Sequence, residues 1–149
     1  IEVTGTQAVF QHGVSNDATV NGRQLVQSGT SNRAVVNVGG SQVVSAGGIA
    51  NGTVLNGGTP TVQTPNSRAN GTVINSGGVQ TLTLGASAAD PVINDGGVQT
   101  VIHQGAAINT FVLTGCVQNL ERGLLGGAVA TDTHHSGGVP YVYERATAT

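Results

Sequence analysis

The sequence is poor in the residues that most globular domains use to build a core. Among its 149 residues there is no lysine, methionine or tryptophan, and Phe and Tyr occur only twice each. Charged residues make up 8 % of the chain, against roughly a quarter in typical soluble domains. The lack of large core-filling side chains argues against a compact globule, and the low charge argues against a charge-rich disordered segment.

The charge balance and the single cysteine exclude several function classes. A formal net charge of −2 provides no basic face for nucleic acid and no polybasic membrane anchor. No apolar run approaches the ~18–20 residues of a transmembrane helix. Cys116 is the only cysteine, so we expect neither an internal disulfide nor a multi-thiolate metal site. Because the chain starts at Ile1 without a signal peptide, we interpret it as a mature or excised segment.

What the sequence does contain is a repeat. The phrase "ANGTVLNGG" at 50–58 returns as "ANGTVINSGG" at 69–78. The period is about 19 residues, close to the shorter periods of stacked-repeat architectures. One apolar column lies two positions after a Gln or Pro, with a spacing that varies slightly from copy to copy. Its members are Val9, Val26, Val44, Val62, Leu82, Val101, Leu120 and Val142. A stricter column keeps the period without variation, and its members are Val36, Leu55, Ile74, Ile93 and Val112.

The repeat predicts an all-β fold. We expect each unit to contain two short strands joined by two turns, with Gly pairs at the corners where positive φ is needed. A unit of about 19 residues cannot bury its own apolar side chains, so copies must stack. The sequence therefore predicts a single parallel β-solenoid domain over residues 1–149, with roughly seven to eight turns. Small side chains are expected to fill a narrow corner, namely Ala50, Ala69, Ala88 and Ala107.

Asparagine also recurs at fixed positions, and two interpretations remain open. Asn32, Asn51 and Asn70 form one column. Stacked amides can hydrogen-bond from turn to turn, as in other ladders of identical side chains. Alternatively, asparagine tolerates the left-handed backbone conformation of a corner. The two interpretations are compatible, and neither makes these residues catalytic.

The pattern is interrupted at 116–136, where we expect an irregular insertion with a bulged loop between residues 120 and 130. Leu124 and Leu125 lie in this loop. If exposed, they form an apolar patch that suits a partner. The alternative is that they fold back onto the core.

The residue pattern provides no convincing active site, metal site or cofactor site. Alternate residues of one strand are ~6.5–7 Å apart, so Asp132, His134 and Ser136 are too distant for a nucleophile–base hydrogen bond. Asp90 and Asp95 fall on different corners of one turn, without the carboxylate pairing that glycoside hydrolysis needs. A carbohydrate-active β-helix enzyme is nevertheless the rival from another class. Loss of turnover on changing Asp90, Asp95 or Asp132 would support it.

The repeat resembles a known family. The chain's consensus G-G-x-Q-x-V-x-x-G-x-x-A-N-G-T-V-I-N-x-G-G is similar to the AIDA-type repeat in passenger domains of self-associating autotransporter adhesins. The resemblance covers about residues 5–142 and is weakest at 116–136. It implies a right-handed β-solenoid on the bacterial surface, exported through the outer membrane, without enzymatic activity.

The resemblance also implies a role and partners. Such passengers mediate cell aggregation, biofilm formation or host adherence by binding each other, another surface protein or a host receptor. Some carry O-linked sugar that a dedicated glycosyltransferase adds to Ser or Thr near strand-to-turn junctions. The matching candidates here are Ser28, Ser45, Thr64, Ser76, Thr83 and Ser136.

Our hypothesis is therefore a non-enzymatic adhesin segment that acts through its lateral face. We expect that face to carry Thr, Asn and Ser with scattered Arg23, Arg33, Arg68 and Arg122. The alternative is a structural stalk or assembly module of a larger surface protein, with the rod acting as a spacer.

Overall fold

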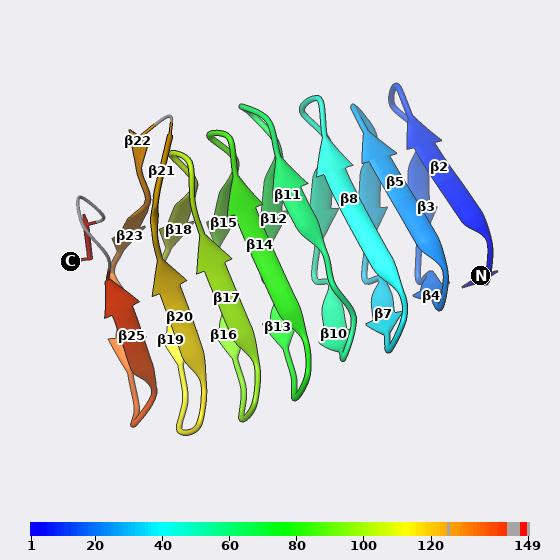
Figure 1. Cartoon of the computed structure of the whole chain (residues 1–149). Helices are drawn as coiled ribbons and strands as arrows, with labels where there is room; N and C mark the ends of the chain where they lie inside the picture. The colour runs from blue at the N-terminus through cyan, green and yellow to red at the C-terminus, as the bar shows by residue number, and fades with distance from the viewer. Residues whose placement is uncertain (125, 143–146, 149) are drawn as a thin grey trace.

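The chain folds into a rod of stacked turns, shown in Figure 1. The computed structural model describes residues 1–124, 126–142 and 147–148. Within these ranges every regular element is a β-strand, and the strands form three parallel sheets of eight strands each together with one small hairpin. The chain passes through the three sheets once per turn, so each strand pairs with its counterparts in the turns before and after it.

The three sheets are named here A, B and C. Sheet A consists of β1 (Glu2–Val3), β4 (Thr19–Val20), β7 (Val35–Asn37), β10 (Val54–Asn56), β13 (Val73–Ile74), β16 (Val92–Ile93), β19 (Phe111–Val112) and β24 (His134–His135). Sheet B consists of β2 (Thr6–Phe10), β5 (Arg23–Gln27), β8 (Ser41–Ser45), β11 (Thr61–Gln63), β14 (Val79–Thr83), β17 (Val98–Val101), β20 (Val117–Leu120) and β25 (Val139–Val142). Sheet C consists of β3 (Val14–Asn16), β6 (Thr30–Asn32), β9 (Ile49–Asn51), β12 (Arg68–Asn70), β15 (Ser87–Ala89), β18 (Ala106–Ile108), β23 (Val129–Thr131) and β26 (Thr147–Ala148).

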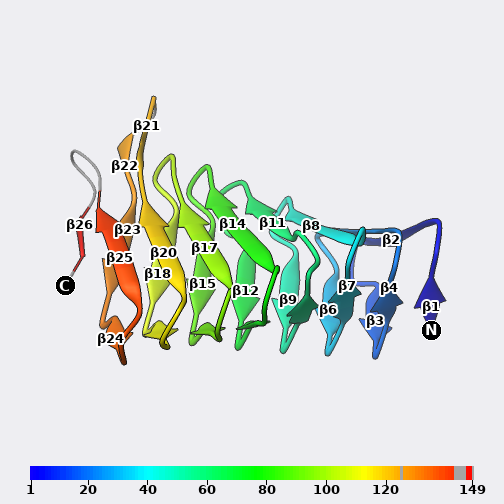
Figure 2. The same ribbon diagram turned by 60° about the horizontal axis from the view of Figure 1, so that its bottom comes forward.

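The all-β solenoid predicted from the repeat is confirmed, but the expected two strands per turn are wrong. Each turn has three strands, and the third belongs to sheet C (Figure 2). The alanines expected to fill a corner lie in these strands, paired in register and buried. A three-residue strand points only its middle side chain inward. The sequence of the sheet C strands therefore lacks the alternating β-branched core residues from which a strand is usually predicted.

Both apolar columns form the ladders that the spacing predicts. In sheet B the register pairs Val9 with Val26 and continues turn by turn to Leu120 and Val142. In sheet A it joins Val36, Leu55, Ile74, Ile93 and Val112, and Val20 precedes them. These sheet A side chains are 0 % exposed. The varying spacing in sheet B is absorbed by the turns and leaves the ladder in register.

The core also contains a polar ladder that the repeat analysis did not anticipate. Five glutamines of sheet B are at most 1 % exposed, namely Gln24, Gln42, Gln80, Gln99 and Gln118. The Gln99 side-chain amide donates to the Gln80 carbonyl oxygen at 2.9 Å, and Gln118 donates to Gln99 at 2.9 Å. A buried amide without a partner costs free energy, so stacking identical amides satisfies groups that a single turn could not. The signal was in the sequence, because residues i and i+2 of a strand face the same side.

Four of the five buried glutamines, all except Gln99, also hydrogen-bond to a hydroxyl, and the source of that hydroxyl changes along the rod. In the early turns the hydroxyl comes from sheet C, where Ser31 donates to Gln24 at 3.0 Å. Later it comes from the corner between sheets C and A, where Thr53 donates to Gln42 at 3.3 Å. The position that holds Ser31 is alanine in the later turns, and the position that holds Thr53 is alanine in the early turns.

Two prolines in consecutive turns compensate for each other in this polar ladder. Pro60 occupies the glutamine position of its turn, so Thr72 has no glutamine there. In the next turn Pro91 occupies the threonine position, so Gln80 has no hydroxyl of its own. Gln80 donates across the turns to Thr72 at 3.0 Å. The two exchanges therefore leave both polar groups satisfied.

The asparagine columns hydrogen-bond along the stack, so the first of the two interpretations is confirmed. The Asn51 amide donates to Asn32 at 3.0 Å, and Asn70 donates to Asn51 at 2.9 Å. The left-handed residue of this corner is the next one along the chain, with φ of +53° at Arg33 and +61° at Gly52. The asparagines therefore stabilise the stack, and their successors make the corner.

The sequence predicts an irregular insertion over residues 116–136. The insertion in the structure is shorter. Val117 to Leu120 stay in register with the previous turn, and so do Val129 to Thr131. The extra residues form an antiparallel hairpin of β21 (Arg122–Gly123) and β22 (Gly126–Gly127), which lies within the predicted loop and projects from the rod in Figure 1.

Cys116 is part of the regular pattern, because it takes the place of the second glycine of a pair. It lies one repeat period after Gly97 and is 1 % exposed. Its Sγ donates to the Ile93 carbonyl oxygen at 2.9 Å. Burial raises the pKa of the Cys116 thiol. The side chain thus acts as a small, protonated core residue.

The polar ladder predicts a stability difference between two matched glutamine substitutions. Gln99→Met keeps the side-chain length but removes the donor to Gln80, leaving a buried carbonyl oxygen unsatisfied. We expect a loss of about 1–3 kcal/mol in the free energy of unfolding, measured as a lower urea midpoint. Gln27→Met is the control, because Gln27 projects outward from the same sheet and is only half-buried. Equal midpoints for the two variants would contradict a stabilising role of the ladder.

Candidate functional surfaces

The charged side chains do not gather on one face, which corrects the predicted lateral face with four arginines. Arg23 projects from sheet B and Arg68 from sheet C, and both are exposed. Arg122 lies in the hairpin. Arg33 lies at the corner between sheets C and A. A partner that binds one face of the rod would therefore contact only some of these four arginines.

One exposed ion pair joins consecutive turns at that corner. The Arg33 guanidinium donates two hydrogen bonds to the Asp17 carboxylate, each of 2.8 Å. The two side chains are 66 % and 64 % exposed, so solvent screens their attraction. The hydrogen bonds from Arg33 hold the pKa of Asp17 below its ordinary value, and the same contact raises the pKa of Arg33.

The predicted sugar-acceptor hydroxyls differ widely in accessibility. Ser28, Ser76 and Ser136 are exposed, and Thr64 and Thr83 are half-buried. Ser45 is only 5 % exposed, so it could accept a sugar only if the corner opened. The structure thus argues against Ser45 and leaves the other positions as predictions.

The local contacts of these hydroxyls differ as well. Ser28 Oγ donates to the Ala46 carbonyl oxygen at 2.6 Å. Thr64 Oγ1 accepts from the Ala46 amide at 2.8 Å and lies 3.0 Å from Ser67 Oγ. Thr83 Oγ1 lies 3.2 Å from Nδ1 of His103. A sugar on Ser28 Oγ would remove the hydrogen bond that this hydroxyl donates, and one on Thr64 would crowd its corner contacts, so exposure and not local bonding separates the candidates.

The leucine patch can be assessed only in part. Leu124 is 100 % exposed at the tip of the hairpin. Leu125 lies outside the described residues, so the predicted pair of leucines stays a prediction. For Leu124 itself, the alternative that it folds back onto the core is wrong.

The residues weighed for enzymatic chemistry occupy separate positions. Asp90 accepts a hydrogen bond from Asn109 at 2.6 Å. His134 stacks on Phe111 with ring centroids 4.9 Å apart, on the outer side of sheet A. His135 pairs in register with the buried Val112. In the described part of the chain, no three His, Cys, Asp or Glu residues are grouped closely enough to hold a metal ion.

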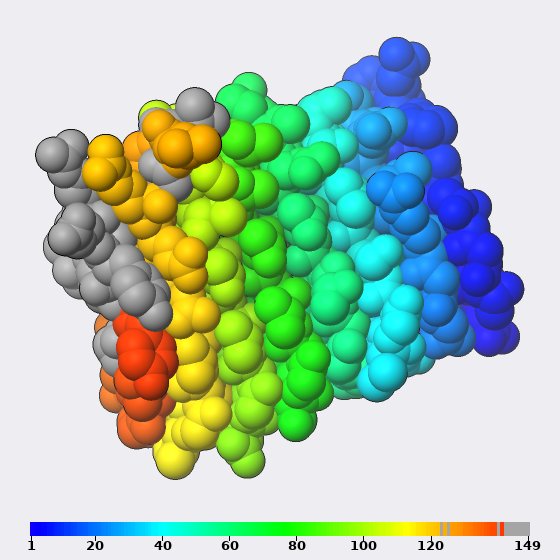
Figure 3. Space-filling view, in the orientation of Figure 1, coloured from blue at the N-terminus to red at the C-terminus, as the bar shows by residue number. Residues whose placement is uncertain are grey.

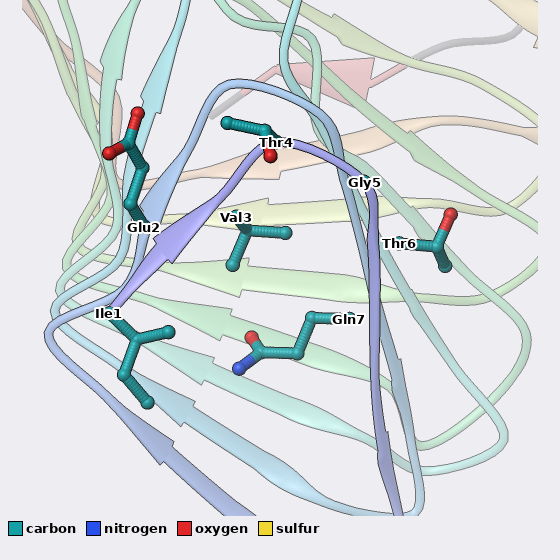
Figure 4. A pocket seen from close by; sticks show the side chains of 7 residues that line it. All are labelled: Ile1, Glu2, Val3, Thr4, Gly5, Thr6 and Gln7. Atoms are coloured by element: carbon teal, nitrogen blue, oxygen red, sulfur yellow. The ribbon is translucent and has the colours of Figure 1, made fainter.

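A hollow of about 310 Å³ lies at the N-terminal end of the rod and is lined by residues 1–7. Figure 4 shows that Val3 and Gln7 point into the interior, whereas Glu2 points outward. Gln7 accepts hydrogen bonds from Gln24 at 2.6 Å and Ser15 at 3.1 Å. The hollow therefore lies next to the first described turn of the core ladders, where Gln7 belongs to the polar ladder.

The outer side of sheet A carries an apolar row that the sequence analysis missed. The register aligns outward-facing valines of consecutive turns and then Phe111. The members are Val35, Val54, Val73, Val92 and Phe111. The signal was available, because each residue precedes a member of the strict apolar column, and neighbouring residues of a strand face opposite sides.

The in-register stack of turns defines the chain as a parallel β-solenoid, which is consistent with the AIDA-type repeat that the sequence resembles. Among solved structures it is similar to the TibA55–350 fragment, crystallised after TibC-catalysed hyper-glycosylation, with a TM-score of 0.91 and 35 % sequence identity. The similarity covers 99 % of this chain and 54 % of the TibA fragment, so the chain spans about half the length of that structure. The finding supports an adhesin-type autotransporter passenger segment.

No protein-family model matches the chain, and no curated protein sequence matches it. Across the described ranges, no helix has the length and apolarity needed to cross a membrane.

The exposed ion pair predicts a pKa shift that a single substitution removes. In Arg33→Ala the Asp17 carboxylate loses both guanidinium donors, so its pKa should rise toward the ordinary value of 3.8. A depressed pKa contributes stability that is present above the ordinary value and lost as the pH falls through the folded-state pKa. NMR titration of the Asp17 carboxyl carbon measures this shift directly. An unchanged pKa in the variant would show that the ion pair does not form in solution.

Proposed function

We propose that the chain is a non-enzymatic segment of a bacterial surface adhesin of the autotransporter passenger type. It is exported through the outer membrane and brings cells together by contact between the sides of rods, which supports aggregation and biofilm growth. The observation that carries this proposal is the similarity to the TibA fragment over 99 % of this chain. Another surface protein or a host receptor is the alternative partner for the same lateral surface.

The geometry supports binding rather than catalysis. The rod exposes a long side, and two of its carboxylates are held in separate contacts, Asp17 against Arg33 and Asp90 against Asn109. Lateral contact between rods would form many weak interactions at once. A hydrogen bond contributes only about 0.5–1.5 kcal/mol net, but regularly spaced contacts add up to avidity.

This proposal predicts settling of cells that display the chain, with little dependence on salt. Charged residues are sparse, so raising the salt from roughly 50 to 500 mM should change settling by less than about 2-fold. Cells displaying an unrelated passenger of similar length are the control. Abolition of settling by salt would point to an ionic mechanism. Absence of settling at any salt concentration would favour the structural stalk, in which the rod is a spacer.

We further propose that exposed serines of the chain accept sugar from a glycosyltransferase. The TibA fragment was hyper-glycosylated by TibC, and Ser28, Ser76 and Ser136 are exposed near turns of this rod. These three positions are preferred over Thr64 and Thr83, which are half-buried.

The intact mass of chain co-expressed with such an enzyme tests this proposal. We expect additions in steps of one sugar above 14.8 kDa. Ser28→Ala and Ser76→Ala should each remove one step. Ser45→Ala is the matched control and should remove none, because Ser45 is 5 % exposed. An unmodified mass, or loss of a step only in Ser45→Ala, would contradict this assignment of acceptors.

A further inference from the structure

Four asparagines of the chain are followed directly by glycine, namely Asn21, Asn51, Asn56 and Asn70. This dipeptide is reactive, because the backbone nitrogen of the glycine can attack Cγ of the asparagine, and glycine has no Cβ to hinder the approach. The glycine N–H must be able to lose its proton, and the asparagine NH₂ must be able to leave as ammonia. Hydrogen bonds donated by either group oppose the reaction, so the fold decides which pair reacts.

In three of the four pairs the glycine N–H is held by a neighbouring turn. It donates to a backbone carbonyl oxygen at 2.7 Å in Gly22, 2.8 Å in Gly52 and 2.8 Å in Gly71. The exception is Gly57. Its backbone forms only an isolated bridge with Asn37, and among the described residues its N–H has no such hydrogen bond. The Gly57 nitrogen can therefore react without first breaking a contact between turns.

The side-chain amide of Asn56 is also less restrained than that of Asn21, its counterpart at the corner between sheets A and B. Asn21 donates to the Glu2 carboxylate at 3.1 Å and accepts from Asn37 at 2.8 Å. Asn56 accepts from Asn75 at 2.8 Å, but its Nδ2 donates to no group in the described part of the chain. Both asparagines are exposed, so their contacts and not their exposure distinguish them.

The other two pairs lie at the corner that follows sheet C, where the asparagines are half-buried. Asn51 donates to Asn32, and Asn70 donates to Asn51. Their NH₂ groups are thus engaged in the stack. Within the described ranges, Asn56 with Gly57 is therefore the one Asn-Gly pair in which neither reactive group donates a hydrogen bond.

This pair exists because one corner is a residue shorter than the corners beside it. Between sheets A and B the chain reads NVGG at 37–40 and NSGG at 75–78, whereas the corner between them reads NGG at 56–58. The left-handed glycine has φ of +79° at Gly39, +78° at Gly57 and +74° at Gly77. Only in the short corner does it follow asparagine directly. The missing residue thus creates the Asn-Gly pair.

The pair lies at an edge of the rod that water can reach. The corners between sheets A and B form the lower edge of the rod in Figure 1, and Figure 3 shows the side chains of successive turns ending at this edge as parallel bands. Asn56 is exposed and Gly57 is half-buried. A Cβ at Gly57 would lie 2.5 Å from Cγ2 of Val38, so a test of the pair should change Asn56 and keep the glycine.

We propose that Asn56 is a site of spontaneous deamidation and reacts before the other three pairs. The Gly57 nitrogen forms a bond to Cγ of Asn56, the bond from Cγ to Nδ2 breaks, and the NH₂ leaves as ammonia with the proton of the Gly57 amide. Water then opens the resulting succinimide. Cleavage between the nitrogen and Cγ gives an aspartate at this position, and cleavage between the nitrogen and the main-chain carbonyl carbon gives an isoaspartate. Water is the only co-reactant.

The reaction makes the charge of the rod depend on its age. Each conversion adds one negative charge to a chain whose formal net charge is −2. An aspartate keeps an oxygen that can accept from Asn75, so the stack of later turns is retained. An isoaspartate adds one carbon to the main chain in the corner that is a residue short. In both products the new carboxylate lies at the exposed edge, whereas the neighbouring Leu55 is 0 % exposed.

Incubation of the purified, folded chain at mildly alkaline pH tests this proposal, with all four pairs measured in one sample. Cleavage after arginine places Asn21 and Asn70 in separate peptides, and fragmentation in the mass spectrometer distinguishes Asn51 from Asn56 in a third peptide. We expect Asn56 to convert at least about 10-fold faster than Asn21, which is protected by two donated hydrogen bonds. In urea, where the turns are unstacked, the four pairs should convert at similar rates.

A matched pair of variants tests the assignment by a second measurement. Asn56→Gln keeps the amide but would have to close a larger and less favourable ring. It should abolish the acidic form that ion-exchange chromatography detects during incubation. Asn21→Gln is the control, because Asn21 is exposed at the equivalent corner and also precedes glycine. It should leave the acidic form unchanged. Urea midpoints check that both variants remain folded.

Three results would overturn the inference. The first is equal conversion of the four pairs in the folded chain, or faster conversion at Asn21 than at Asn56. The second is a folded chain in which none of the pairs converts while the unfolded chain does. The third is a preference for Asn56 that persists in urea, because the local sequence and not the fold would then determine it.

Discussion

The rod depends on pairing buried polar groups of one turn with polar groups of a neighbouring turn. The buried glutamines illustrate this constraint, because a single turn has no internal partner for an amide that is 0 % exposed, such as Gln99. Stacking in register supplies the partner, and the backbone ladders follow the same rule. In every bond between two glutamines or between two asparagines of the described chain, the later turn donates to the earlier one, as with Gln42 to Gln24 and Asn94 to Asn75.

This constraint also explains which changes the repeat tolerates. The hydroxyl beside the glutamine ladder moves from sheet C to the following corner, because Ser31 and Thr53 reach the same kind of acceptor from different places. Pro60 and Pro91 are tolerated one turn apart, because Gln80 bridges to Thr72. The hairpin at Arg122–Gly127 is tolerated because it leaves from a corner and returns the chain to register at Val129. The fold therefore tolerates sequence changes that keep the contacts of the inward-facing side chains.

The sequence was sufficient to predict the solenoid, both apolar ladders and the asparagine stacking, because residues such as Leu55 and Ile74 recur with one period and one chemistry. It was insufficient for the third strand, since Ala69 carries no β-branched signal. The glutamines mark the repeat in the sequence, but their polarity usually indicates exposure and so does not predict a place in the core. The spacing of residues in the sequence does not show which candidate surface residues are exposed, and the structure does. Ser45 and Ser28 both lie at the end of a sheet B strand, one position apart in the register, yet Ser45 is buried and Ser28 is exposed. The outward-facing valines of sheet A are less evident in the sequence, because each one directly precedes a member of the regular buried apolar column.

The uniform middle of the rod has a consequence for how such a protein changes over generations. From Ile49 to Ala106 the sheet C strands begin at a constant interval of one repeat period, and Ala50, Ala69 and Ala88 are equivalent by register. Recombination between neighbouring repeats of the coding DNA could delete or duplicate one such interval. The result would be a rod shorter or longer by one turn, about 4.8 Å. Its inward-facing side chains would make the same types of contact as in the present rod. The length of the rod can thus be adjusted in small, heritable steps without designing a new fold.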